Sequence, residues 1–77
     1  MQVDIRLFGQ FRHLLRETDG RLTLRVVEGT TVRDVLERVQ VPEAEVGLVS
    51  VNGQKAPVET PLRDGDEVCI SSPIGGG

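Results

Sequence analysis

One segment of the sequence, residues 28–41 (EGTTVRDVLERVQV), has the apolar spacing of an amphipathic helix. Its apolar side chains recur at i, i+3, i+4 and i+7 and so form one stripe, made of Val32, Val35, Leu36 and Val39. Thr31 can cap the N-terminus, and Asp34 completes a capping box with aspartate in place of glutamate. Pro42 disfavours helical geometry at the residue before it, so we expect the helix to stop near Val41.

Other segments alternate apolar and polar residues, which is typical of half-buried strands. In the last of them, Val68 and Ile70 share one face and Cys69 points the other way. Valine is abundant and aromatic residues are scarce, so we expect a core of valine, leucine and isoleucine. The alternation predicts strands at residues 3–8, 22–27 and 67–71.

Between the helix and the last strand, residues 47–58 have the pattern of a hairpin. Val49 and Val51 alternate with polar neighbours, and Asn52-Gly53 is a strong signal for a two-residue turn. Pro57 follows soon afterwards and limits the returning strand to a short or edge element.

A second, shorter helix is expected over residues 9–17, directly after the first strand. Phe8, Phe11 and Leu15 recur at i, i+3 and i+7, with Leu14 beside them. This spacing predicts about two helical turns that pack on the sheet.

The order of these elements is strand, short helix, strand, helix, hairpin, strand. It predicts an α+β domain of the β-grasp, or ubiquitin-like, type, with one main helix on a mixed sheet of four to five strands. In that architecture the first and last strands lie side by side at the centre of the sheet. We expect a globular domain over residues 1–72 and a flexible glycine tail over residues 73–77.

Composition excludes several classes of function. The net charge is −3 and basic residues do not cluster, so a phosphate-neutralising nucleic-acid surface is not expected. Cys69 is the only cysteine, which excludes an internal disulfide and a cysteine-based zinc site. No apolar run approaches the roughly 20 residues that span a bilayer, and no signal peptide is visible. We therefore expect a cytoplasmic protein with no membrane segment.

Three polar features of the sequence are typical of ordinary structure rather than of a site. Cys69 is expected to be a small strand residue, and His13 to be a surface or half-buried histidine. The acidic side chains after residue 63 lack the ladder of oxygen ligands that calcium needs. We interpret them as turn and solubility residues, or as charges that steer a basic partner, and expect no metal site: Asp64, Asp66 and Glu67.

The chain ends in three glycines, Gly75, Gly76 and Gly77. Glycine loses more backbone freedom on ordering than any other residue, so we expect this tail to be mobile in the free protein. A glycine strand can thread a channel too narrow for other sequences and deliver an unhindered carboxylate. Activation of a carboxylate uses ATP, yet the chain has no phosphate-binding glycine loop. ATP is therefore expected to bind a partner, with this chain as the substrate and no cofactor of its own.

Three segments together resemble the small ubiquitin-like sulfur-carrier proteins, which include the small subunit of molybdopterin synthase and the thiamine sulfur carrier. They are VNG at residues 51–53, PLRDGDEV at residues 61–68, and the glycine terminus. The segment IRLFGQFRHLL, residues 5–15, is similar to the molybdopterin type in particular. The likeness covers essentially the whole chain.

The resemblance implies a mechanism. An adenylating enzyme related to the ubiquitin-activating enzymes would adenylate the carboxylate of Gly77. Gly76 and Gly77 together would correspond to the terminal Gly-Gly pair of the family. Sulfur from a persulfide donor would displace AMP and leave a thiocarboxylate. A larger molybdopterin synthase subunit would receive the tail, with Pro73, Ile74 and Gly75 as partner-binding residues. The chain itself would be the sulfur-carrying subunit of a transferase, without an active site of its own.

The sequence leaves several functions of the tail open. Sulfur carriers of this shape also serve thiamine, tungsten cofactor, cysteine and tRNA thiolation. The same activated glycine in a protein modifier would be joined to a lysine, and Lys55 is the only lysine here. The tail could also be passive. Ser71-Ser72 stands where the molybdopterin type usually has large apolar residues, which leaves the partner surface open.

Overall fold

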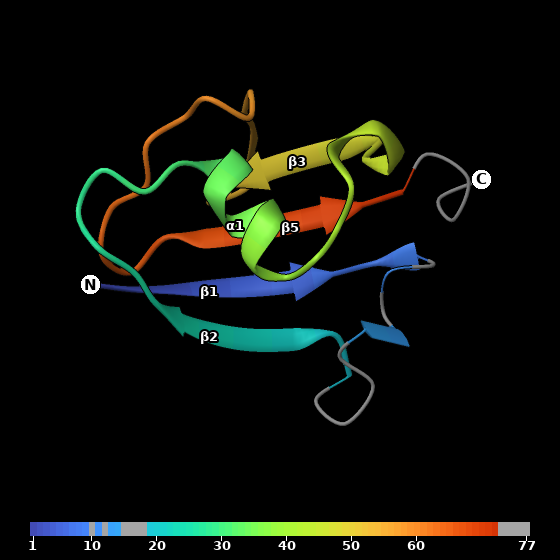
Figure 1. Ribbon diagram of the computed structural model, residues 1–77, viewed down its shortest axis with the longest axis horizontal. Helices are drawn as coiled ribbons and strands as arrows, with labels where there is room; N and C mark the ends of the chain where they lie inside the picture. The colour runs from blue at the N-terminus through green and yellow to red at the C-terminus, as the bar shows by residue number, and fades with distance from the viewer. Residues whose placement is uncertain (10, 12, 15–18, 73–77) are drawn as a thin grey trace.

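In the described residues, five strands form one mixed sheet with one α-helix on it (Figure 1). The structure is a computed structural model and describes residues 1–9, 11, 13, 14 and 19–72. The strands are β1 (Gln2–Leu7), β2 (Arg21–Arg25), β3 (Leu48–Val51), β4 (Gln54–Lys55) and β5 (Glu67–Ser71). The helix α1 spans Val32–Arg38, and the short 3-10 helix η2 spans Glu43–Glu45.

The strand order in the sheet is β2-β1-β5-β3-β4. β1 and β5 are parallel, and the other three neighbouring pairs are antiparallel. The last strand therefore lies at the centre of the sheet beside the first, as the β-grasp prediction requires. The mixed sheet with one helix confirms the predicted fold class.

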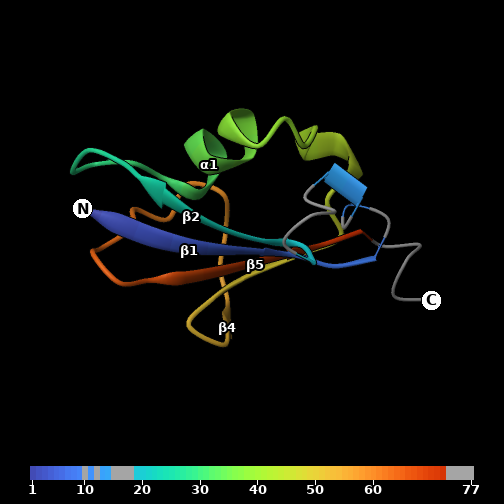
Figure 2. The ribbon, with the colours of Figure 1, turned by 90° about the horizontal axis from the view of Figure 1, so that it is seen from below.

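The core lies between α1 and one face of the sheet, and the other face carries no helix in the described part of the chain (Figure 2). The helix contributes three fully buried side chains, Val32, Val35 and Leu36, and each strand side chain beneath them comes from an alternate position. Burying each such side chain stabilises the fold by about 1.5–3 kcal/mol. The fully buried strand residues are Val3, Ile5, Leu7, Val68 and Ile70.

The predicted start of α1 is confirmed. The Asp34 N–H donates to the Thr31 hydroxyl and the Thr31 N–H donates to the Asp34 carboxylate, which together make the capping box. The end of the helix differs from the prediction, because α1 stops at Arg38 rather than near Val41. Gln40 turns into the left-handed region at φ 62°, and this ends the helix before Pro42 acts.

The C-terminus of α1 has the hydrogen bonds of a Schellman motif. The Val41 N–H donates to the Leu36 carbonyl (2.9 Å), and the Gln40 N–H donates to the Glu37 carbonyl (3.2 Å). Glycine is the usual residue at the left-handed position, because a side chain there costs about 1–2 kcal/mol. Here a glutamine occupies it.

Replacing this glutamine by glycine is therefore expected to stabilise the protein. Gln40→Gly relieves the left-handed strain but adds chain entropy to the unfolded state, which leaves a net gain of about 0.5–1 kcal/mol in the free energy of unfolding. Urea denaturation measures it. Gln40→Ala keeps a Cβ in the same conformation and is expected to give no gain, so equal effects of the two substitutions would contradict this account of the helix end.

The predicted hairpin and its turn are confirmed. Asn52 (φ 54°) and Gly53 (φ 86°) form the two-residue turn between β3 and β4. The Asn52 side chain also ties this turn to the chain before β5: its amide donates to Asp66 (2.8 Å) and its carbonyl oxygen accepts from the Glu67 N–H (2.9 Å). The other Asp66 oxygen accepts from the Arg63 N–H (2.8 Å). Two of the three segments that carry the family likeness, residues 51–53 and 61–68, are thus held together.

The segment after β1 differs from the predicted two-turn helix: its described helical residues form 3-10 turns, and two of the side chains expected to pack on the sheet are exposed. Phe11 is buried, and its N–H donates to the Phe8 carbonyl in an i to i−3 bond (3.3 Å). Phe8 is not part of the core, because Leu7 before it points inward and strand alternation turns Phe8 to the opposite face. Leu14 is also exposed, and Leu15 lies outside the described residues.

Candidate functional site

The candidate site is the C-terminal end of β5, where the chain continues into the glycine tail. On one side the Phe8 N–H donates to the Ile70 carbonyl (2.9 Å), and on the other the Gly47 N–H donates to the Ser71 carbonyl (2.8 Å). Ser72 follows with only 3% of its surface exposed. The strand is therefore held from both sides up to its last residue, so the start of the tail has a defined position on the body.

The five residues predicted to act lie beyond this point. Pro73, Ile74, Gly75, Gly76 and Gly77 are all outside the described residues. Five residues reach at most about 16–18 Å when extended. Their predicted roles as partner-binding residues and as the reacting end stay predictions.

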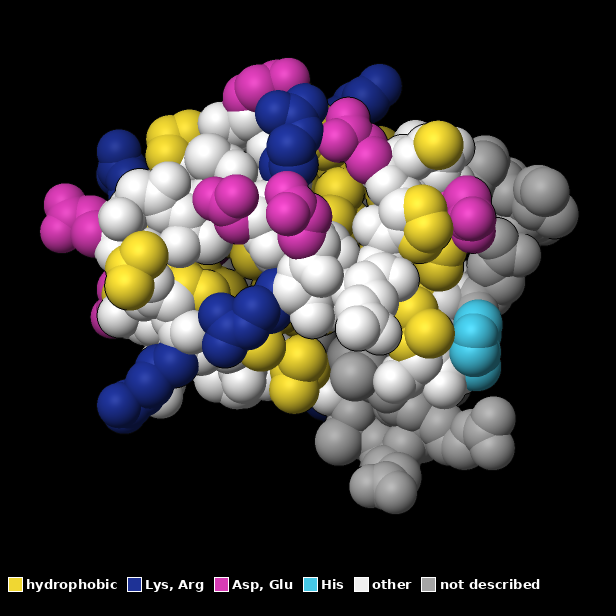
Figure 3. Space-filling model, viewed as in Figure 1, with side chains coloured by type: hydrophobic (Ala, Val, Ile, Leu, Met, Phe, Trp, Pro, Cys, Tyr) yellow, Lys and Arg dark blue, Asp and Glu magenta, His cyan; other side chains and the backbone are white. Residues whose placement is uncertain are grey.

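Two exposed apolar side chains flank the end of β5. Leu48 is the register partner of Ser71 on β3 and is 46% exposed, and Phe8 follows the β1 end with 38% exposed. Both side chains face away from α1, because Leu7 and Val49 before and after them point into the core, so they lie on the far side of the view in Figure 3, which looks onto the helix. Because large exposed apolar side chains near a functional end favour protein contacts, Phe8 and Leu48 make this a candidate docking rim.

Sequence reasoning missed both residues of this rim. Phe8 was counted with the core because of its helical spacing to Phe11, and Leu48 was not singled out. The usable signal was strand alternation: Leu7 and Val49 point inward, so their neighbours Phe8 and Leu48 point outward. The two residues supply apolar surface beside Ser71-Ser72, a pair of positions that has no apolar side chain of its own.

Cys69 lies on the face of the sheet without the helix, between Arg6 of β1 and Ser50 of β3. It is half-buried, and its Sγ lies 4.0 Å from a carboxylate oxygen of Glu67. This is the position of an ordinary strand side chain, and no further role is assigned to it.

The remaining candidates are surface or turn residues. His13 is exposed. Asp64 accepts from the Gln2 N–H (2.7 Å) and so, like Asp66, holds a turn. Within residues 1–9, 11, 13, 14 and 19–72, no cluster of histidine, cysteine, aspartate or glutamate side chains could hold a metal ion. No helix in that part of the chain is long and apolar enough to span a membrane.

A charged network joins α1 to η2 and to the loop between β4 and β5. The Arg33 guanidinium donates to Glu43 (2.9 Å) and to Glu59 (3.2 Å). The hydrogen bond from Arg33 lowers the pKa of the Glu43 carboxyl, so this pair stabilises the fold at neutral pH and loses its contribution as the pH falls through that lowered value. All three groups are exposed, so the contribution of the network to the stability of the fold is small. We interpret the network as a structural contact between neighbouring segments and assign it no chemical role.

Residues 1–74 match a protein-family model described as Mut7-C ubiquitin, which covers nearly the whole chain. The chain belongs to the Mut7-C ubiquitin family. This membership, together with the solved structures of similar fold, confirms the resemblance to the ubiquitin-like sulfur-carrier proteins. No relative of the chain was found among curated proteins.

Three solved structures share the fold of this family member. SAMP1 of Haloferax volcanii, a small archaeal modifier protein, has a TM-score of 0.76 at 21% identity, over 100% of each chain. A protein assigned as subunit 1 of the molybdopterin converting factor of Pyrococcus furiosus has a TM-score of 0.75 at 25% identity, over 95% of this chain and 98% of that one. The third, at 20% identity and TM-score 0.66 over 100% of each chain, belongs to a complex of subunits 1 and 2 of the Helicobacter pylori molybdopterin-converting factor.

Proposed function

We propose that this protein is a sulfur carrier whose C-terminal Gly77 is adenylated by a partner enzyme and then converted to a thiocarboxylate. The observation that carries the proposal is the central position of β5, which is bonded on both sides up to Ser71 and leads directly into the glycine tail. A firmly held strand followed by a narrow chain is the arrangement that presents one reactive end to another protein. Membership of a ubiquitin-like family supports it.

The proposed chemistry takes place on the terminal carboxylate. Its oxygen attacks the α-phosphate of ATP in the partner enzyme, which releases pyrophosphate and leaves an acyl-adenylate on Gly77. The terminal sulfur of a persulfide then attacks the acyl carbon and AMP leaves. A thiol breaks the remaining S–S bond, which leaves the thiocarboxylate and a disulfide on the donor. This chain binds no cofactor in the scheme, and ATP belongs to the partner.

The described residues contribute docking and positioning. Phe8 and Leu48 lie on either side of the β5 end, so a partner that receives the tail also covers these two side chains. Phe8 is 38% exposed and Leu48 46%, so covering what remains of each is worth about 1 kcal/mol before the costs of association. This contact orders the body against the partner's channel, and the glycines then enter without side-chain obstruction.

The acceptor that we propose is the larger subunit of a molybdopterin synthase, in the cytoplasm. The similarity to subunit 1 of a molybdopterin converting factor supports this choice. So does the Helicobacter pylori complex of subunits 1 and 2, in which one chain has the fold of this protein. Thiamine, tungsten cofactor, cysteine and tRNA thiolation pathways are the alternative acceptors, because they use carriers of the same chemistry.

The second candidate function is that of a protein modifier. It is favoured by the structural likeness to SAMP1, a small archaeal modifier protein. In that case the adenylated Gly77 is attacked by a lysine amine of a target. Lys55, the only lysine of this chain, is exposed on β4 and is the side chain through which copies would be joined to one another.

Intact-mass analysis separates the two functions. We expect that incubation with the cognate adenylating enzyme, ATP and a persulfide donor replaces one oxygen of the chain by sulfur, because the thiocarboxylate differs from the carboxylate only in that atom. The same incubation without ATP is the matched control and is expected to leave the chain unchanged. Adducts of this chain on other proteins, with no sulfur-containing form, would favour the modifier instead.

A further inference from the structure

β2 forms one edge of the sheet, so one side of its backbone faces away from β1. Met1 and Val26 exchange both backbone hydrogen bonds (2.9 Å each), which fixes the alternation along the β1–β2 pair. It follows from the register that Arg21, Thr23 and Arg25 direct their N–H and C=O groups toward the free edge. An exposed row of this kind is a template for pairing with another extended chain.

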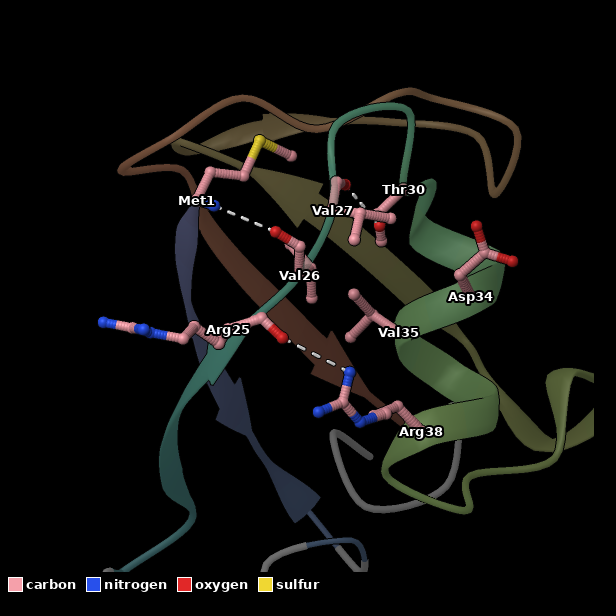
Figure 4. Close-up of a pocket in the computed structure, with 8 residues that line it drawn as sticks. All are labelled: Met1, Arg25, Val26, Val27, Thr30, Asp34, Val35 and Arg38. Carbon is pink, nitrogen blue, oxygen red and sulfur yellow. Dashed lines mark hydrogen bonds between the residues drawn. The ribbon is translucent and has the colours of Figure 1, made fainter.

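A groove runs along this edge, between β2 and α1 (Figure 4). It has a volume of about 500 Å³, and Val26 and Val35 supply apolar walls. Val27, at the end of the groove, is 78% exposed, the largest value among the exposed large apolar side chains of the described residues. The edge of the sheet thus has apolar surface beside it on the helix side.

The charged side chains that line the groove are two arginines, Arg25 and Arg38, and one carboxylate, Asp34, so positive charge prevails there although the whole chain carries −3. Figure 3 shows basic side chains at the lower left, over β2 and the end of α1, with acidic side chains above them over the rest of α1. The guanidinium of Arg38 crosses the groove and donates to the Arg25 carbonyl (3.4 Å), so it closes one end of the edge. Neither Arg25 nor Arg38 has a carboxylate partner among the residues that the structure describes.

The same charges act against pairing of two copies through this edge. If two β2 strands paired antiparallel about Thr23, each Arg21 would lie opposite an Arg25 of the other copy. Like charges directly opposite each other destabilise a strand pair. Arginines on an exposed edge therefore oppose self-association and leave the edge suited to a strand that carries negative charge.

We propose that β2 and the groove beside α1 form a docking site for an extended acidic segment of a partner protein, which adds to the sheet as a sixth strand. This is a contact separate from the β5 end. The backbone of Thr23 supplies hydrogen bonds to the added strand, and Arg38 swings off the Arg25 carbonyl to lengthen the pairing.

The two faces of the sheet specify the sequence of that segment. Side chains of the added strand alternate between the helix side and the open side. On the helix side they meet Val26 and Val35, and on the open side they lie beside the exposed arginines Arg21 and Arg25. The segment that fits therefore alternates apolar and acidic residues.

A capped synthetic peptide in which valine and glutamate alternate tests the proposal against the full 77-residue chain. Backbone amide NMR is expected to show the largest shifts at Thr23, Arg25 and Val27, with binding that weakens as salt is added. A peptide with lysine in place of glutamate is expected to bind at least about tenfold more weakly. Equal binding of the two peptides, or no shift along β2, would overturn the proposal.

Variants separate the charge from the backbone pairing. Arg25→Glu is expected to weaken binding by roughly tenfold or more, whereas Lys55→Glu, the same charge change on the opposite edge strand, changes it by less than about twofold. Thr23→Pro removes an N–H that the β1–β2 pair does not use and is expected to abolish the β2 shifts. Thr23→Val loses the hydroxyl bond to Asp4 and keeps that N–H, so it retains binding.

Two outcomes count directly against the acidic partner. One is an unchanged affinity of Arg25→Glu for the acidic peptide. This substitution changes an exposed side chain, so the result can be interpreted even if the proline variant does not fold. The other is β2 shifts that appear with protein concentration alone, accompanied by a dimer in analytical ultracentrifugation, which would make a second copy the occupant.

Discussion

One alanine added after Gly77 is expected to abolish thiocarboxylate formation and to leave the free energy of unfolding unchanged. The addition replaces the carboxylate of Gly77 by a peptide bond, and it places a methyl group in the narrow channel that we propose for the partner. The core lies within residues 3–70 and is not touched. Intact mass after incubation with the adenylating enzyme, ATP and a persulfide donor measures the first effect, and urea denaturation measures the second.

A removable extension provides the control for this experiment. The same chain with a protease-cleavable sequence after Gly77 is expected to be inert before cleavage, and to regain full reactivity once cleavage restores the terminal glycine. Sulfur incorporation on the extended chain without trimming would show that Gly77 is not the reacting end.

Ile70→Ala is expected to give the largest loss of stability among single truncations near the candidate site, about 2–5 kcal/mol in the free energy of unfolding. Ile70 is fully buried in the central strand, and its neighbours come from β1, β3 and α1, so they cannot collapse into the space. A domain of this size has roughly 4–10 kcal/mol in total, so the variant is expected to be partly unfolded at 37 °C. Thermal and urea denaturation followed by circular dichroism measure the change.

The adjacent residue supplies the matched control. Cys69→Ala truncates the same strand on the face without the helix, where the side chain is half-buried, and is expected to cost about 1 kcal/mol or less. Equal losses at the two positions would mean that the core does not lie only on the helix side of β5.

Most of the fold could be predicted because its signals are local. Strand alternation acts between residues two apart, the capping box joins Thr31 and Asp34, which are three positions apart, and the Asn52-Gly53 turn specifies its own hairpin. The end of α1 was missed because it depends on a left-handed glutamine, Gln40, and no pattern in the sequence marks a glutamine for that conformation.

The candidate site divides in the same way. The glycine tail is visible in the sequence, as is the likeness to sulfur carriers, and the expectations for residues 73–77 come from there alone. The docking rim was not visible as a site, because Phe8 and Leu48 are 40 positions apart and meet the end of β5 only through the pairing of β1 and β3 with it.

From its residue pattern alone, this protein has one capped helix, alternating strands, a defined hairpin turn and a terminal glycine thread. These features depend on interactions between residues a few positions apart, so the sequence pattern alone is enough to predict them. The three-dimensional path of the chain decided that β5 is central, that Phe8 faces outward, and that the backbone edge of β2 lies open beside a groove reached by Arg38. Contacts between distant residues form only when the whole sheet has closed against the helix, and no local pattern records them.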